Sequence, residues 1–290
     1  MPSLQALCAA GRRPERVISQ PARAAGRGQQ VQDPPVAAWA KIAGLEVEQP
    51  EKINGRKFRE SIEALEPDLC VVVAYGAILT RQLLDVPRLG FINVHASLLP
   101  RYRGAAPIQA AIVAGDSEAG VTIMQIEPGL DSGLMLLSRT VPIRRSETTA
   151  DLGPKLAEAG AELLVDAISR LEFGLIDPEP QDERAATYAP KLTKADGLVT
   201  WNLPANEISN RLRAYTPWPG LRAELGGVEV KLLELYVVEI AGDEKPGTIL
   251  GTEGMAALVR CGDATAVAIR RAQRPGRRPV AGAELVRSFE

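Results

Sequence analysis

The sequence predicts an α/β fold with two domains: a Rossmann-like domain built on a parallel sheet, followed by a small OB-like β-barrel. Over the first two-thirds of the chain, short β-branched runs alternate with helical patterns, which is typical of a parallel sheet covered by helices. Beyond residue 204 the strand-like runs are short and closely spaced, with Gly between them, as in a small barrel. The 290 residues accommodate both, since domains usually hold ~100 to 200 residues.

The first domain is expected over residues 1–177. Its strands are predicted from apolar, β-branched runs, and its helices from apolar residues at helical spacing that end near Gly or Pro. The run at 69–74 is apolar throughout, which is typical of a strand buried on both faces. The predicted strands cover residues 16–20, 69–74, 91–94, 121–126 and 135–143, with a shorter one within 44–48. The predicted helices cover residues 35–43, 57–65, 81–84, 105–114 and 147–172.

A linker is expected over residues 178–204, where Pro178, Pro180, Pro190 and Pro204 interrupt any periodicity. The second domain then takes residues 205–290. Its predicted strands cover residues 221–225, 228–237, 247–250, 256–260 and 264–269.

Composition excludes several classes of protein. Hydrophobic residues make up 46% and charged residues 24%, as in an average soluble globular protein, and the net charge of -2 argues against a uniformly basic nucleic-acid binder. The three cysteines show no CxxC spacing, which favours reduced thiols in the cytoplasm over a metal site or disulfides. No apolar run approaches the ~20 residues that crossing a membrane requires.

A candidate catalytic trio stands out in the middle of the chain. In the predicted strand FINVH, Asn93 and His95 point to the same side because strand side chains alternate. Ligands bind at the carboxyl ends of parallel strands, where this pair would lie. Asp131 sits in the Gly-flanked loop EPGLDSG, where a carboxylate can reach an imidazole. A lone histidine is more often structural, but the polar Asn93 in an apolar strand favours a site.

These three groups suit acyl transfer to an amine. The tetrahedral intermediate of that reaction carries an oxyanion, which the Asn93 amide and a protonated His95 can stabilise. A neighbouring carboxylate favours the imidazolium and can take the proton that the amine sheds. Asp131 is the candidate for that role.

The runs NVHASLLPRYRGAAPIQAAI and GVTIMQIEPGLDSG resemble the signature of the folate-dependent formyltransferases, which use 10-formyltetrahydrofolate as co-substrate. The resemblance implies that Asn93, His95 and Asp131 are the catalytic trio, and that no metal is required. It also implies that the SLLP stretch and the end of the strand at 69–76 contact the folate. The implied folate contacts are Ser97, Leu98, Leu99, Pro100, Tyr75 and Gly76.

Three further features resemble the tRNA-formylating members of that family and imply initiator methionyl-tRNA as the acceptor. The Gly-rich stretch 20–32 carries Arg23 and Arg27, which would contact the acceptor stem. The segments ATYAPKLTKADGLVTW and NRLRAYTPWPG match the family's linker and the entry to its second domain. The C-terminal domain ends in a basic stretch suited to phosphate contacts. Its arginines are Arg270, Arg271, Arg274, Arg277 and Arg278.

Other interpretations stay open at this point. The same chemistry could act on a small amine, or release formate by hydrolysis, and the chain could be a catalytically inactive remnant that binds tRNA. The family normally begins with a strand and a Gly-containing loop, whereas this chain begins at the following helix, with Met1 where the family commonly has Val. A start codon assigned too far downstream, at a valine codon that can also initiate, would explain the missing strand. If the strand is truly absent, we expect weak activity or poor solubility. The arginine stretches could also be solvated surface. The protein is expected to be a cytoplasmic monomer.

Overall fold

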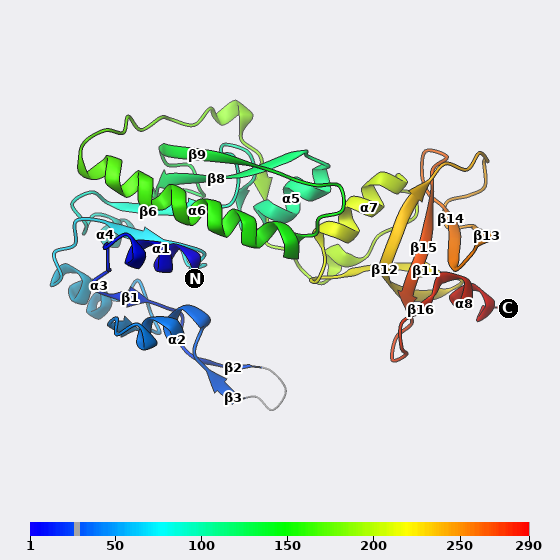
Figure 1. The fold of residues 1–290 in the computed structure, drawn as a ribbon, viewed down its shortest axis with the longest axis horizontal. Coiled ribbons are helices and arrows are strands. Elements are labelled where there is room, and N and C mark those ends of the chain that lie inside the picture. Colours follow the sequence, from blue (N-terminus) through cyan, green and yellow to red (C-terminus); the bar gives the residue numbers. More distant parts are fainter. Residues whose placement is uncertain (26–29, 290) are drawn as a thin grey trace. The chain divides into compact units, whose positions relative to one another are not determined.

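The computed structural model describes residues 1–25 and 30–289, which divide into two compact units (Figure 1). The first unit comprises Met1–Ala105, Ala119–Val141 and Pro154–Tyr188. The second comprises Ala106–Glu118, Pro142–Gly153 and Ala189–Glu290. Segments 106–118 and 142–153 therefore cluster with the C-terminal part of the chain. Among the described residues, no helix is both long and apolar enough to cross a membrane.

The helices and strands that lie wholly or partly in the first unit include all of the predicted strands and, apart from 105–114, the predicted helices, but the short strands at 23–25, 30–32, 103–104 and 188–189 were not predicted. The helices are α1 (Pro2–Ala9), α2 (Pro35–Ile42), α3 (Arg56–Glu63), α4 (Arg81–Leu84) and α6 (Thr149–Glu172), with the 3₁₀ turn η1 (Glu183–Ala185). The strands are β1 (Val17–Ile18), β2 (Arg23–Ala25), β3 (Gln30–Gln32), β4 (Val47–Glu48), β5 (Cys70–Val72), β6 (Phe91–His95), β7 (Arg103–Gly104), β8 (Glu118–Gln125), β9 (Met135–Pro142) and β10 (Tyr188–Ala189).

The main sheet of the first unit has the strand order β5-β6-β8-β9. Strands β5 and β6 are parallel, with Val72 opposite Asn93, and so are β1 and β4. Strands β6 and β8 are antiparallel, with His95 opposite Thr122, so the prediction of a parallel sheet was wrong at this pair. The helix between them, α5 (Pro107–Ala114), belongs to the second unit and packs on α7 (Ala205–Ala214). It does not serve as a crossover helix, which two parallel neighbours would require.

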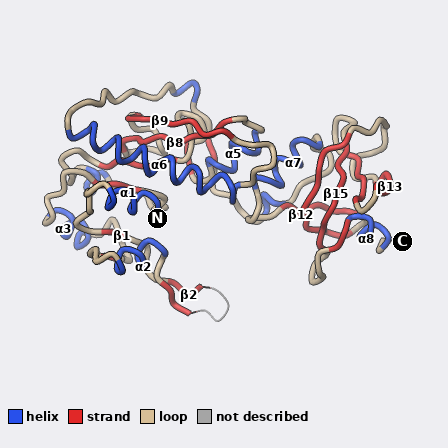
Figure 2. The backbone as a smooth tube through the Cα atoms, viewed as in Figure 1, coloured by secondary structure: helices blue, strands red, loops and turns tan. Residues whose placement is uncertain are grey.

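Helix α6 runs alongside the strands of this sheet (Figure 2). Its buried residues Leu163, Leu164 and Ala167 form one cluster with Ile92 of β6 and Ile123 of β8. Burying each leucine or isoleucine side chain stabilises the fold by about 1.5–3 kcal/mol. The core thus fixes β6, the strand that carries Asn93 and His95.

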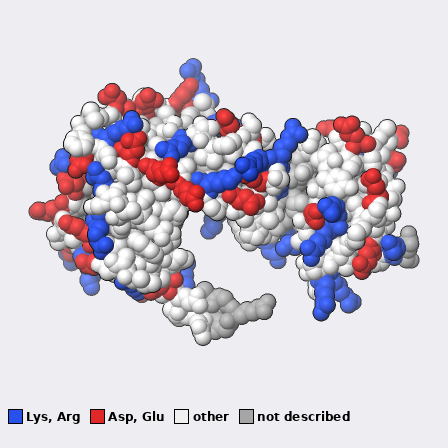
Figure 3. Space-filling model, viewed as in Figure 1, with Lys and Arg blue, Asp and Glu red and all other residues white. Residues whose placement is uncertain are grey.

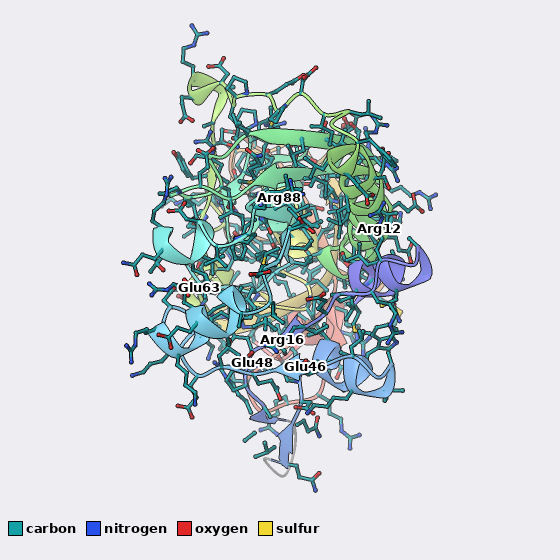
Figure 4. The ribbon with its side chains drawn as sticks, turned by 90° about the vertical axis from the view of Figure 1, so that its left-hand side faces the viewer. Arg12, Arg16, Glu46, Glu48, Glu63 and Arg88 are labelled. Carbon is teal, nitrogen blue, oxygen red and sulfur yellow. The ribbon has the colours of Figure 1, made fainter. Side chains whose placement is uncertain are left out.

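The small parallel pair of β1 and β4 is held by charge as well as by backbone hydrogen bonds. Arg16 precedes β1, and its guanidinium lies 2.8 Å from the Glu46 carboxylate and 3.2 Å from that of Glu48 (Figure 4). The Arg16 side chain is only 17% exposed, so water screens these pairs less than it would at the surface. The two carboxylates flank the register pair of Val17 and Val47.

The second unit contains a six-stranded antiparallel sheet. Its order is β11-β12-β15-β14-β13, and β16 also pairs with β15. Within the described residues, no pairing joins the edge strands β11 and β13, so the sheet is not a closed barrel. The strands are β11 (Leu221–Leu225), β12 (Val228–Val238), β13 (Ile249–Glu253), β14 (Ala256–Arg260), β15 (Ala266–Gln273) and β16 (Val280–Ala281). Helix α8 (Gly282–Arg287) and the 3₁₀ turn η2 (Ala195–Gly197) complete the unit.

Candidate active site

His95 is the last residue of β6 and is only 5% exposed. Asn93, two residues earlier, is half-buried and lies on the same face of the strand because strand side chains alternate. Among the residues that the structure describes, none makes a hydrogen bond with the Asn93 side-chain amide. The amide is therefore available to an incoming ligand beside the histidine.

Both ring nitrogens of His95 face oxygen atoms. Nε2 lies 3.0 Å from the backbone carbonyl oxygen of Tyr102, which can only accept, so Nε2 carries a proton and donates to it. Nδ1 lies 3.6 Å from Oδ2 of Asp131. That separation is too long for a good hydrogen bond. Of the two ring nitrogens, Nδ1 is thus the one that can form a hydrogen bond with a substrate.

The loop at 126–134 brings Asp131 back to the histidine. Gln125, at the end of β8, lies opposite Ile92 near the start of β6, so the loop has to return along β6 to reach His95. The backbone N–H of Gly104 donates to Asp131 Oδ2 at 2.8 Å and holds the carboxylate there. Among the residues that the structure covers, none hydrogen-bonds to the other carboxylate oxygen, which can therefore take up a proton.

Strained backbone surrounds the histidine ring. Tyr102 and Asp131, which supply the two oxygens facing the ring, both adopt left-handed backbone, with φ of 59° and 50°. Side chains other than glycine rarely adopt this conformation, which costs of order 1 kcal/mol or more and clusters at functional sites.

The SLLP stretch predicted to contact folate follows β6 directly. Ser97 and Leu99 are buried, whereas Leu98 and Pro100 are half-buried. The hydroxyl of Thr122, opposite His95 on β8, donates to the Ser97 carbonyl at 2.7 Å and accepts from the Leu99 N–H at 3.2 Å. One buried side chain therefore fixes the shape of this stretch.

Tyr75 and Gly76 follow β5. Because β5 is parallel to β6 and Val72 pairs with Asn93, both residues extend from the sheet edge at which β6 ends. Gln20 donates a hydrogen bond to the Tyr75 carbonyl at 3.0 Å, and burial raises the pKa of the Tyr75 hydroxyl.

Three residues of this region were missed by reasoning from the sequence. Thr122 is fully buried in an apolar strand. A polar residue among apolar ones there could have indicated a structural hydrogen bond. Arg103 lies within the quoted motif, and its side chain is 2% exposed. Gln181 hydrogen-bonds to the Asp131 loop from a Pro-rich segment whose pattern carries no signal for such a contact.

The residues predicted to bind tRNA lie in several places. Arg23 is exposed on β2, which pairs with β3, while Arg27 lies outside the described residues. In the second unit, Arg270 pairs with Glu234 at 3.0 Å, and the Arg274 guanidinium lies over the Phe289 ring. Within the described part of the chain, no hydrogen bond or ion pair involves the guanidinium of Arg271, Arg277 or Arg278, although the Gln273 side chain donates to the Arg277 backbone carbonyl.

A cavity of about 660 Å³ lies beside the turn between β15 and β16. Arg274, Arg277 and Arg278 line it. Figure 3 shows basic side chains projecting at the lower end of the C-terminal sheet, where Figure 1 places this turn. Among the described residues, no group of three or more His, Cys, Asp or Glu side chains could hold a metal ion.

Comparison with known proteins matches both parts of the chain to one family. A family model described as formyl transferase matches residues 12–168, and one described as formyl transferase, C-terminal domain, matches residues 191–290. Among solved structures, an N-formyltransferase from Helicobacter canadensis, in complex with folinic acid and dTDP-3-aminofucose, superposes with a TM-score of 0.69. It is 17% identical, and the match covers 94% of each chain. HypX from Aquifex aeolicus, in complex with tetrahydrofolic acid, gives a TM-score of 0.59 at 22% identity, covering 86% of this chain and 43% of the other. These two likenesses concern the fold.

Sequence relatives are much closer. The methionyl-tRNA formyltransferase of Aromatoleum aromaticum is 43% identical over 287 residues, covering 99% of this chain and 90% of that protein. The methionyl-tRNA formyltransferase of Anaeromyxobacter sp. (strain K) is 46% identical over 278 residues, covering 95% and 89%. With both family models matched in order and this identity sustained along the chain, the protein belongs to the formyltransferase family, among the methionyl-tRNA formyltransferases.

Proposed function

We propose that this protein transfers the formyl group of 10-formyltetrahydrofolate to the α-amino group of initiator methionyl-tRNA, which prepares that tRNA for translation initiation. The observation that carries the proposal is the placement of His95 Nδ1 3.6 Å from the Asp131 carboxylate, beside the Asn93 amide. The relatives that are 43% and 46% identical are methionyl-tRNA formyltransferases, which supports this acceptor over others.

In the proposed reaction, the amino nitrogen attacks the formyl carbon and the carbonyl oxygen becomes an oxyanion. The Asn93 amide and the Nδ1–H of protonated His95 stabilise that charge. The Tyr102 carbonyl keeps the ring oriented through Nε2. Asp131 takes the proton that the amine sheds, through the carboxylate oxygen that Gly104 does not hold. The bond from the formyl carbon to N10 of the folate then breaks, the carbonyl re-forms, and N10 takes a proton.

The folate is proposed to lie against the stretch after β6 and the residues after β5. Ser97, Leu98, Leu99 and Pro100 would form one wall, and Tyr75 and Gly76 the other. The rigid shape that Thr122 gives to the first stretch supports this assignment, because a preorganised wall binds a ring system at a lower entropic cost.

The tRNA is proposed to contact Arg23 and Arg27 in the first unit and Arg270, Arg271, Arg274, Arg277 and Arg278 in the second. Among the described residues, the guanidinium groups of Arg271, Arg277 and Arg278 have no protein partner, which supports phosphate contacts at these three. We also propose that the C-terminal sheet is OB-like, which the bulges of β12 and β13 support because bulges curve a sheet. The protein is proposed to act as a cytoplasmic monomer, without a metal, with residues 1–177, 178–204 and 205–290 as catalytic domain, linker and tRNA-binding domain.

The test is a formylation assay with 10-formyltetrahydrofolate and initiator tRNA charged with labelled methionine. Formyl-methionyl-tRNA should accumulate at a rate proportional to the enzyme concentration. Glycinamide ribonucleotide and an amino-sugar nucleotide serve as alternative acceptors. In a further reaction without any acceptor, the release of tetrahydrofolate and formate is measured. Formylation of an alternative acceptor in place of the tRNA would contradict the proposal, as would acceptor-independent release of formate. Binding of tRNA without product would indicate an inactive remnant.

A further inference from the structure

The side chain of Gln181 is hydrogen-bonded to two backbone carbonyls of the loop that carries Asp131. Its Nε2 donates to the carbonyl oxygen of Asp131 at 2.9 Å and to that of Gly133 at 2.8 Å. A carboxamide nitrogen has two hydrogens, so both are used on this one loop. The backbone of Asp131, the residue proposed to accept the proton, is thus held by a side chain 50 positions away in the sequence.

The other end of the amide is anchored on β7. Gln181 Oε1 accepts from Nε of Arg103 at 2.9 Å. The Arg103 side chain is 2% exposed, and its two terminal nitrogens contact the two carboxylate oxygens of Glu183 at 3.0 and 2.8 Å. Such paired, charge-assisted hydrogen bonds fix the plane of the guanidinium. Because Nε can only donate and the loop carbonyls can only accept, the amide has one orientation that satisfies all three contacts.

The Asp131 loop has little freedom to move at either side of this contact. Gly104, next to Arg103 on β7, donates its N–H to Asp131 Oδ2 at 2.8 Å. A Cβ atom added to Gly133 would clash with the Gln125 carbonyl oxygen, so the loop packs tightly against the end of β8. Asp131 between these points is in left-handed backbone, which relaxes to ordinary values unless neighbouring contacts hold it.

We infer that Gln181 is a positioning residue for Asp131: its two hydrogen bonds keep the aspartate in the left-handed conformation that directs the carboxylate toward His95 Nδ1. The inference rests on the proposed function, since it concerns the rate of formyl transfer. Without those bonds the backbone at Asp131 relaxes, and the carboxylate moves relative to the histidine. A displacement of about 1 Å in a reacting group can cost ~100-fold in rate.

Two substitutions separate this role from simple anchoring of Arg103. Gln181→Glu keeps an oxygen for Arg103 Nε but turns a carboxylate oxygen toward the two loop carbonyls, which repel it. Gln181→Met keeps the length of the side chain and removes both kinds of hydrogen bond. If the contact to Arg103 were all that mattered, Gln181→Glu would behave like the wild type.

We expect both variants to lower kcat by about 10- to 100-fold, with KM for 10-formyltetrahydrofolate and for charged tRNA within about threefold of wild type. Gln82→Glu is the matched control, because Gln82 also accepts from an arginine, Arg59 at 2.9 Å, and the charge change is the same. It should leave both parameters unchanged.

A Gln181→Glu variant with wild-type kcat overturns the inference, as does a loss of kcat explained by the fraction of unfolded protein. If Gln181→Met fails to fold, Gln181→Asn, whose amide is one methylene shorter, takes its place.

Hydrogen exchange of the full chain without substrates gives a readout independent of activity. Amides at 127–134 should exchange faster in both Gln181 variants than in the wild type and in Gln82→Glu, because the anchored carbonyls are released. Unchanged exchange there overturns the inference even if the rate falls. Wild-type protein that exchanges slowly at this loop but forms no formyl-methionyl-tRNA would instead refute the proposed function.

Discussion

His95 on β6 and Thr122 on β8 are opposite one another in the antiparallel register of the main sheet. The same strand pair therefore supplies the histidine and the hydroxyl that closes the Ser97–Leu99 stretch. The register of β6 and β8 therefore sets where the proposed folate wall lies relative to the proposed catalytic imidazole.

Thr122→Val should weaken both stability and folate binding. Valine has nearly the same shape as threonine but leaves the Ser97 carbonyl and the Leu99 N–H without the Thr122 hydroxyl as a partner, which costs about 1–3 kcal/mol. Denaturant unfolding should show a lower midpoint, and KM for 10-formyltetrahydrofolate should rise. Thr122→Ser, which keeps the hydroxyl, should recover most of both. An unchanged midpoint and KM in Thr122→Val would show that the hydroxyl does not hold the stretch.

His95→Ala should reduce turnover by about 10²- to 10⁴-fold, the usual contribution of a general acid or base. The affinity for tRNA should change little, because the imidazole is 5% exposed and faces Tyr102 and Asp131. Single-turnover formylation and filter binding of charged tRNA measure the two quantities separately. Near-normal turnover would remove His95 from the mechanism.

The local part of this site could be predicted from sequence, because it depends on strand periodicity. Alternation in FINVH places Asn93 and His95 on one face, and the Gly-flanked loop marks Asp131. Two things could not be predicted. The helical pattern at 107–114 is the same whether the helix connects two parallel strands or packs elsewhere. The predicted direction of β8 relative to β6 was therefore wrong. The contact from Gln181 to Asp131 joins distant segments and leaves no periodic trace.

The C-terminal arginines should determine how tRNA binding depends on salt. Arg277 and Arg278 are exposed, and replacing both with Ala should lower the slope of log Kd against log salt by about 1 to 2, since each lost phosphate contact contributes ~0.7 to 0.9. Turnover at saturating tRNA should stay near wild type. Arg56→Ala with Lys57→Ala removes the same charge from an exposed part of α3 and is the control. Equal slopes in the two double variants would place the tRNA elsewhere.

Cys261 should make the protein less stable at alkaline pH. Burial raises the pKa of its thiol from 9.0 to about 11. Above pH 9 the unfolded chain loses this proton first, so it binds fewer protons than the folded chain, and the free energy of unfolding falls as pH rises toward 11. Below pH 9 both states keep the proton, and the contribution is constant. Chemical unfolding of wild type and Cys261→Ala between pH 8 and about 11 should show a shallower decline in the variant, since other titrating groups are common to both. Parallel declines would mean that the Cys261 thiol ionises equally well in the folded and unfolded chain.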